Sequence, residues 1–209
     1  MNSTHLGDAL DHWKGSIIKR LQDKCLVREL SVIPMITLEV WSKEVLSAYS
    51  KLLNLNSDDS GLKPKEVFEH THRDTYFTGI DYSGDLFIDP DTGVSNNPKQ
   101  GNDQYITLDD IKGLLDKGKE HDPVIMVYQH RNPEEDWVQK KVAKIEVIIR
   151  EQMEGCLTLR AYDFGIVAML FFSNNKDSDR IKAIEDDIKT ILPRNTMIKD
   201  RIYPRIEAL

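Results

Sequence analysis

Two short runs of apolar residues, within positions 84–88 and 124–128, constrain the fold of this chain most. Each run is bounded by turn residues, and this pattern predicts a strand buried in a sheet. Amphipathic helices are predicted between the strands, and this alternation is typical of an α/β fold with a mostly parallel sheet and helices on both faces. Two late strands, at 157–162 and 166–172, flank the turn sequence 163–165 and predict an antiparallel hairpin at the edge of the sheet.

The other elements follow from the spacing of apolar and capping residues. A further strand is predicted at 30–36, with an irregular end at Pro34. Polar stretches predict loops at 54–65 and 94–103. No internal repeat and no linker interrupts the pattern, so we expect a single domain over 1–209. The predicted helices are 6–24, 43–55, 66–77, 107–118, 136–153 and 179–192.

Length and charge narrow the function classes only slightly. The chain has 209 residues, which is enough for one domain with a full core. Its formal net charge is -7, so the molecule as a whole does not attract nucleic acid, although a local basic patch could. No apolar run reaches the ~18 residues of a membrane helix, and no secretory signal pattern is present. Cys25 and Cys156 lie far apart in the sequence, which favours a cytoplasmic protein with reduced thiols.

An acidic turn follows the strand at 84–88. Asp89 and Asp91 flank Pro90 at the point where this strand ends, and ligands of α/β sheets gather outside the carboxyl ends of strands. The two carboxylates could bind a divalent metal, as in a nuclease or phosphoesterase, with His130 as a further candidate. Asp-Pro-Asp-x-Gly also forms a tight turn for structural reasons alone, so both interpretations stay open.

A second polar corner follows the strand at 124–128. Gln129, His130 and Arg131 combine an acceptor, a titratable group and a fixed charge. Such a set at a strand end suits a phosphate or a base, so these residues are predicted to bind substrate.

The N-terminal segment carries a resemblance to a known family. His5, Gly7, Asp11 and Lys14 fit the pattern His-x-Gly-Asn-x-x-Asp-x-x-Lys, in which Asp8 replaces the asparagine. The segment resembles the first helix of the bacterial ribosomal-RNA adenine methyltransferases that methylate an exocyclic amine. The resemblance implies a Rossmann-like, methyltransferase-type sheet, S-adenosylmethionine as the methyl donor, and a pocket near Asp11 and Lys14.

Asp89-Pro90 resembles the start of the Asp-Pro-Pro-Tyr motif that ends the fourth strand of amino-methyltransferases. The resemblance implies that the Asp89 side chain and the Pro90 carbonyl accept hydrogen bonds from the target amine. The chain departs from the motif because Asp91 replaces the second proline and no aromatic residue follows. The segment 34–37 also lacks the glycines of the family's cofactor turn. The chain is similar, too, to a small set of bacterial proteins with an Asp-Pro-Asp-x-Gly loop.

Together these patterns predict a divergent S-adenosylmethionine-dependent methyltransferase-like domain that acts on nucleic acid. The alternatives are a metal-dependent nuclease or phosphoesterase, and a non-catalytic binding module of the same fold. We expect Asp89 to share a cavity with the N-terminal helix and the 129–131 corner. The catalytic candidates are Asp89, Pro90 and Asp91, and the substrate-binding candidates are Asp11, Lys14, Gln129, His130 and Arg131.

Overall fold

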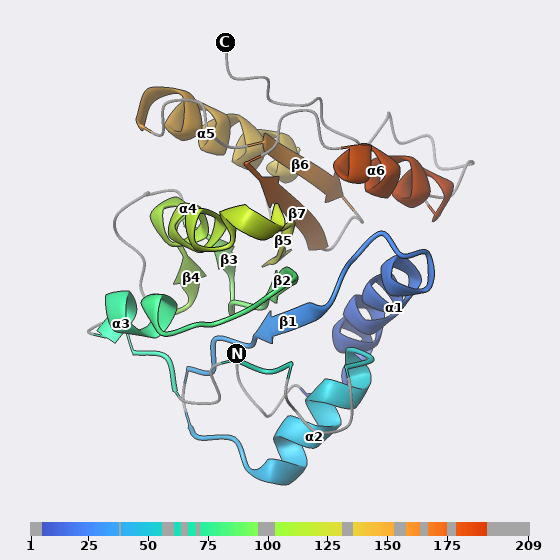
Figure 1. Cartoon of the computed structure of the whole chain (residues 1–209), viewed down its shortest axis with the longest axis vertical. Coiled ribbons are helices and arrows are strands. Elements are labelled where there is room, and N and C mark those ends of the chain that lie inside the picture. The colour runs from blue at the N-terminus through green and yellow to red at the C-terminus, as the bar shows by residue number, and fades with distance from the viewer. Residues whose placement is uncertain are drawn as a thin grey trace.

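The computed structural model shows a mixed α/β fold built on one five-stranded sheet of order β1-β2-β5-β7-β6 (Figure 1). The strands are β1 (Leu30–Ile33), β2 (Asp85–Ile88), β5 (Ile125–His130), β7 (Val167–Ser173) and β6 (Thr158–Asp163). The structure describes residues 6–37, 39–55, 61–63, 67–69, 72–95, 103–130, 136–152, 158–163, 167–174 and 179–191.

Four of the five strands of this sheet point the same way. β1, β2 and β5 pair in parallel, with Leu30 opposite Asp85 and Leu86 opposite Ile125. β7 pairs antiparallel with both β5 and β6, so β7 alone runs in the other direction within the sheet. The prediction of a mostly parallel sheet with a late antiparallel hairpin is therefore confirmed.

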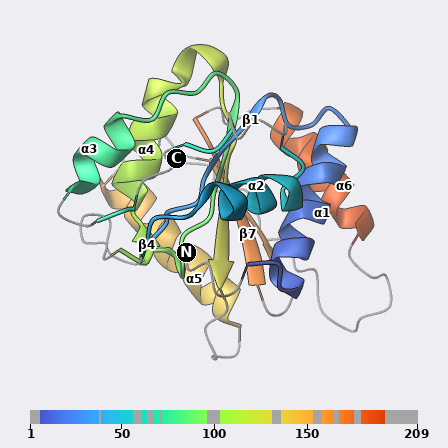
Figure 2. The ribbon, with the colours of Figure 1, turned by 90° about the horizontal axis from the view of Figure 1, so that it is seen from below.

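Helices cover both faces of the sheet (Figure 2). Side chains alternate between the faces along each strand. Phe87 therefore belongs to one core and its neighbours Leu86 and Ile88 to the other. The first core contains side chains of α1 (Ala9–Asp23), α2 (Lys43–Leu52) and α6 (Asp179–Ile191). The second contains those of α3 (Arg73–Thr78), α4 (Leu108–Lys117) and α5 (Trp137–Gln152).

Two segments differ from the sequence-based prediction. The short helix expected over 66–77 begins only at Arg73 among the described residues. The loop expected over 94–103 overlaps a second, two-stranded sheet, in which β3 (Gly93–Val94) pairs in parallel with β4 (Tyr105–Ile106). Strands of two residues have no periodicity, so the hydrophobic pattern could not reveal them.

Compartment and domain organisation stay predictions. None of the described helices is long and apolar enough to cross a membrane. Cys25 is exposed and carries a free thiol, whereas Cys156 lies outside the described residues. Residues 192–209 also lie outside them.

The close approach of α1 and α2 depends on Gly15, because a Cβ at this position would lie 1.8 Å from the Leu52 carbonyl oxygen. Gly15→Ala should therefore lower the free energy of unfolding by about 1–3 kcal/mol, since one helix must shift. Gly113 in α4 is the matched control, because nothing lies within 4 Å of an added Cβ there. Gly113→Ala should stabilise by about 0.5–1 kcal/mol through its higher helix propensity. Urea denaturation measures both variants, and a more stable Gly15→Ala protein would contradict the contact.

Candidate functional site

The candidate site lies at the carboxyl ends of three neighbouring parallel strands. Asp89 directly follows β2, and its backbone N–H donates to the carbonyl of Ile33, the last residue of β1, at 2.9 Å. Tyr128 and His130 end β5 on the other side of β2. The rule that ligands bind outside the carboxyl ends of parallel strands therefore applies to this edge of the sheet.

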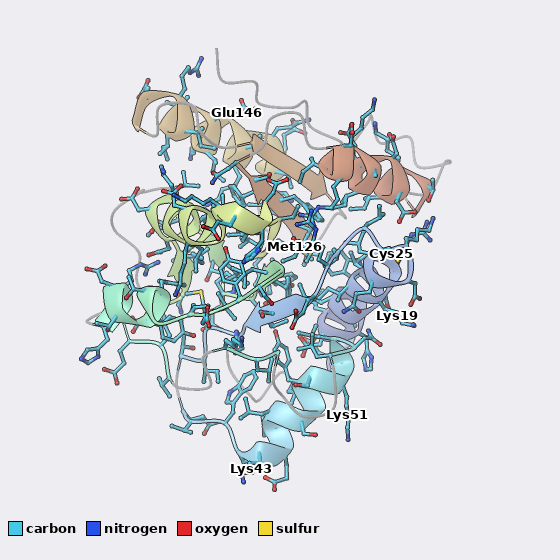
Figure 3. The ribbon with its side chains drawn as sticks, viewed as in Figure 1. Lys19, Cys25, Lys43, Lys51, Met126 and Glu146 are labelled. Carbon is cyan, nitrogen blue, oxygen red and sulfur yellow. The ribbon has the colours of Figure 1, made fainter. Side chains whose placement is uncertain are left out.

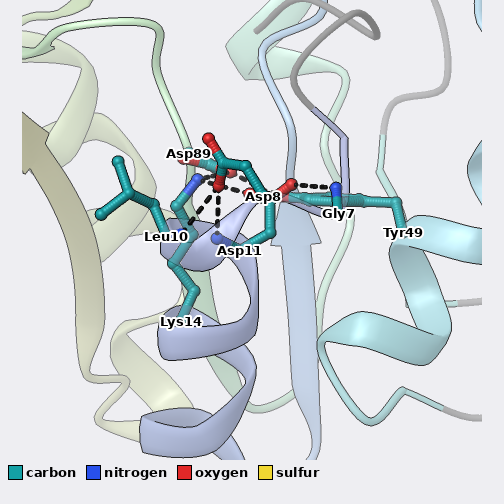
Figure 4. Close-up of polar contacts among 7 residues, drawn as sticks. All are labelled: Gly7, Asp8, Leu10, Asp11, Lys14, Tyr49 and Asp89. Atoms are coloured by element: carbon teal, nitrogen blue, oxygen red, sulfur yellow. Dashed lines mark hydrogen bonds and ion pairs between the residues drawn. The ribbon is translucent and has the colours of Figure 1, made fainter.

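The start of α1 is fixed by its own capping residues. The Asp8 side chain accepts hydrogen bonds from the backbone N–H groups of Leu10 and Asp11, at 2.8 and 3.0 Å. The Asp11 carboxylate in turn accepts one from the N–H of Gly7 at 2.9 Å. Asp11 and Lys14 are three positions apart, so they share one face of the helix. This face meets Asp89 (Figure 4).

Four side chains form a buried ionic centre: Asp11, Lys14, Tyr49 and Asp89. The Lys14 ammonium donates to Asp11 Oδ1 at 3.1 Å and to Asp89 Oδ2 at 2.9 Å. The Tyr49 hydroxyl donates to the same Asp89 oxygen at 2.6 Å. Asp89 is 1% exposed and Lys14 is 4% exposed, so both are shielded from bulk water, and the cavity expected at Asp89 is closed in this structure. Two carboxylates and one ammonium leave the ionic centre with an excess of negative charge.

Burial and the carboxylates together set the protonation of the donors. Burial disfavours the charge of Lys14, but Asp89 and Asp11 outweigh it and raise the pKa of Lys14 above its usual value. Burial, reinforced by Asp89, raises the pKa of Tyr49 far above its usual range. Both groups therefore keep their protons and hold Asp89 Oδ2. Its other oxygen, Oδ1, accepts no hydrogen bond from any described residue.

Aromatic side chains surround the ionic centre. The Lys14 ammonium lies 4.1 Å from the centre of the Tyr128 ring, a cation–π contact. The Trp13 and His130 rings lie 6.3 and 4.8 Å from the Tyr128 ring. Trp41 packs edge-on against Tyr49, with ring centres 5.3 Å apart. Rings from α1, from β5 and from the segment before α2 thus adjoin the ionic centre.

Two polar groups of this aromatic shell have no partner among the residues described. The Tyr128 hydroxyl and the Trp41 Nε1–H are buried and make no hydrogen bond. Unpaired buried polar groups are rare in native proteins, and each calls for an explanation.

The half-buried His130 favours its neutral form. Burial lowers the pKa of its imidazole, and the nearby charge of Lys14 lowers it further.

The acidic turn is held in place by Gln129. Its amide nitrogen donates to the carbonyls of Thr92 and His130, and its amide oxygen accepts from the N–H of Val94 at 2.9 Å. Gly93 has φ +133°, and a Cβ there would lie 2.2 Å from the Gln129 amide oxygen, so only glycine fits. Gln129 therefore positions the turn, and a direct contact with substrate stays a prediction.

The structure describes two of the remaining candidate residues, Pro90 and Asp91, but not Arg131. Pro90 is buried, and the Asp91 carboxylate accepts a hydrogen bond from the Thr37 hydroxyl at 2.9 Å. Arg131 lies outside the described residues. In the described part of the chain, no three carboxylate, imidazole or thiol groups come together as metal ligands. The structure thus brings Asp89 and Lys14 together, whereas it directs Asp91 to a different partner.

The turn after β1 does not fit a methyl donor held against its backbone. Met35 and Ile36 are both fully buried, so their side chains occupy the space beside the strand end. Met35 has φ +43°, in the left-handed region that glycine adopts most easily. The Ile36 carbonyl accepts a hydrogen bond from the N–H of Phe68 at 2.6 Å. A cofactor turn needs exposed backbone at this point, and these residues close it.

Sequence reasoning missed Tyr49 and Trp41. Tyr49 fits the apolar stripe of its helix, so its spacing indicated only a core residue. The sequence offered one signal for Tyr49, namely a side chain with a hydroxyl group within an otherwise apolar stripe.

Comparisons of the chain with family models, curated proteins and solved structures find no match.

Proposed function

We propose that this chain is a divergent, methyltransferase-like domain that binds nucleic acid and receives the exocyclic amine of an adenine at Asp89. The observation that carries the proposal is the asymmetry of the Asp89 carboxylate. Lys14 and Tyr49 hold one oxygen, while the other has no donor among the described residues. An amine N–H is the donor that this second oxygen lacks.

The surroundings of Asp89 suit a flat base. Proteins recognise unpaired bases by stacking them on aromatic side chains and by hydrogen bonds to their edges. Trp13 and His130 are half-buried and flank the fully buried Tyr128 ring. The unpaired groups of Tyr128 and Trp41 offer further polar contacts to a base edge.

The sheet supports a methyltransferase-like fold, but the turn after β1 does not support methyl transfer. β7 lies antiparallel between β5 and β6, which is the late hairpin that the resemblance implies. Met35 and Ile36 fill the turn where the resemblance would place S-adenosylmethionine. The proposal is therefore recognition of the amine, and it includes no transfer step.

The test compares two short single-stranded RNAs by fluorescence anisotropy. One contains adenine, and in the other every adenine is replaced by purine, which lacks the exocyclic amine. A hydrogen bond to a charged group contributes about 1.5–3 kcal/mol, so the purine strand should bind about 10- to 100-fold more weakly. Asp89→Asn should abolish the difference. Asp81→Asn changes an exposed carboxylate that lies before the amino end of β2, whereas Asp89 follows the carboxyl end, so this variant should preserve it.

Equal affinity of the unchanged protein for both strands would overturn the proposal, and this comparison requires no variant. A thermal-shift titration tests the cofactor argument separately. A ligand at a hundredfold excess over its dissociation constant stabilises by about 2.7 kcal/mol. Such a stabilisation by S-adenosylmethionine would show that Met35 and Ile36 do not block its binding.

A further inference from the structure

A second feature adjoins the ionic centre: a hollow of about 610 Å³ between α1 and α2, here called the α1–α2 hollow. This volume lies in the range of small-molecule sites, about 300–1,000 Å³. Its polar and small lining residues include His12, Gly15, Ser16, Lys19, Lys51 and Asn54.

The two helices present different faces to the ionic centre and to the hollow. On α1, Lys14 points to Asp89, while Lys19 lines the hollow. On α2, Tyr49 donates to Asp89, while Lys51 lines the hollow. Gly7 belongs to both places, because it lines the hollow and its N–H donates to Asp11 of the ionic centre. A ligand in the hollow therefore lies beside the proposed base site.

The α1–α2 hollow is locally cationic on an acidic protein. None of its lining residues carries a carboxylate, although the chain has a formal net charge of -7. The Lys51 ammonium and the His12 imidazole pair with no described side chain. Lys19 pairs with Asp23 at the surface, where both side chains are more than half exposed. Lys19 and Lys51 project from the same side of the molecule (Figure 3).

We propose that the α1–α2 hollow holds a phosphate of the RNA strand whose base reaches Asp89, an inference that rests on the proposed function. Lys51 and Lys19 supply the charge, and the unpaired imidazole of His12 supplies a hydrogen-bonding group. A lysine that contacts phosphate releases counterions, and each such contact steepens the salt dependence of binding. The hollow therefore makes binding salt-dependent, and Asp89 makes it base-dependent.

The test measures binding of the adenine-containing RNA by anisotropy at several salt concentrations, between about 50 and 200 mM. A variant that removes one lysine–phosphate contact should reduce the slope of log affinity against log salt by about 0.7 for a single strand. Lys51→Gln should show such a fall, and Lys51→Gln with Lys19→Gln a larger one. Lys43→Gln is the matched control, because Lys43 lies at the opposite end of α2 and outside the hollow. It should leave the slope unchanged.

Three outcomes would contradict the phosphate site in the α1–α2 hollow. A slope that Lys51→Gln and Lys43→Gln change equally, or not at all, would overturn the hollow as a phosphate site. The preference for adenine over purine would survive that result, so the proposed function would stand. No binding of either RNA by the unchanged protein would overturn both proposals. Adenosine monophosphate that binds as tightly as the RNA would show that the hollow takes a free nucleotide and would overturn the assignment to a strand.

Discussion

Replacing Lys14 by methionine should lower the free energy of unfolding by about 3–5 kcal/mol, because it leaves buried carboxylates without their cation. Lys14 is the cation that contacts both Asp11 and Asp89, and these two residues are only 2% and 1% exposed. Methionine has a similar length, so the loss reflects charge and hydrogen bonding more than packing. Urea denaturation at neutral pH measures the effect.

Lys19→Met is the matched control for Lys14→Met on the same helix. Lys19 pairs with Asp23 at 3.1 Å, but the two side chains are 57% and 61% exposed. Exposed ion pairs of this kind contribute about 0.2–1 kcal/mol, so the control should change stability by less than about 1 kcal/mol. Similar losses in the two variants would show that the ionic centre is open to water.

The stability difference between the unchanged protein and Lys14→Met should also depend on pH. The folded pKa of Lys14 is raised above its usual value of 10.5, although burial opposes the charge, because Asp89 and Asp11 stabilise it. A raised pKa of a basic group contributes stability fully below the unfolded pKa and loses it as the pH rises through the folded pKa. The stability gap between the unchanged protein and Lys14→Met should therefore stay constant from neutral pH to about 10 and shrink above that.

Local patterns were sufficient to predict most elements of the fold. The apolar run that ends at Ile88 and the one at 124–128 are buried in the centre of the sheet, as their lack of polar alternation indicated. The place of β7 between β5 and β6 was not predictable in this way, because strand order depends on contacts between distant segments. The same reason explains why the pairing of β3 with β4 was missed.

The candidate site was predictable only in part. Asp89 was indicated by its position at a strand end, and Asp11 and Lys14 by a resemblance in four N-terminal positions. Tyr49 was not, because it lies 40 positions from the carboxylate that it contacts. A helical stripe shows which face is buried, but not which buried hydroxyl meets a charge on a distant part of the chain. Gln129 was interpreted as a substrate ligand, since a sequence does not reveal that its amide pairs with the backbone of the acidic turn.

The second large effect is expected at the opposite, amino end of β2, where Asp85 ties three segments together. Its carboxylate accepts two hydrogen bonds from Arg180 of α6, both at 2.9 Å. It also accepts hydrogen bonds from the backbone N–H groups of Arg28 and Val124, at 2.7 and 2.8 Å. Asp85 is fully buried, and the Arg180 side chain is 15% exposed. Asp85→Asn should therefore cost about 3–5 kcal/mol, because the Arg180 charge loses its counterion in a buried place.

Asp187→Asn is the matched control for Asp85→Asn, since Asp187 also receives a two-pronged arginine contact, from Arg20 of α1 at 2.6 and 2.8 Å. It differs because Lys24 also contacts it, at 2.5 Å, and because the Arg20 and Lys24 side chains are 36% and 50% exposed, so water reaches both cations. Water can replace much of this pair, so its loss should cost about 1 kcal/mol or less. Urea denaturation of the two variants gives the comparison directly. Equal losses in the two variants would contradict the argument that burial and the two backbone donors make the Asp85 contact the stronger one.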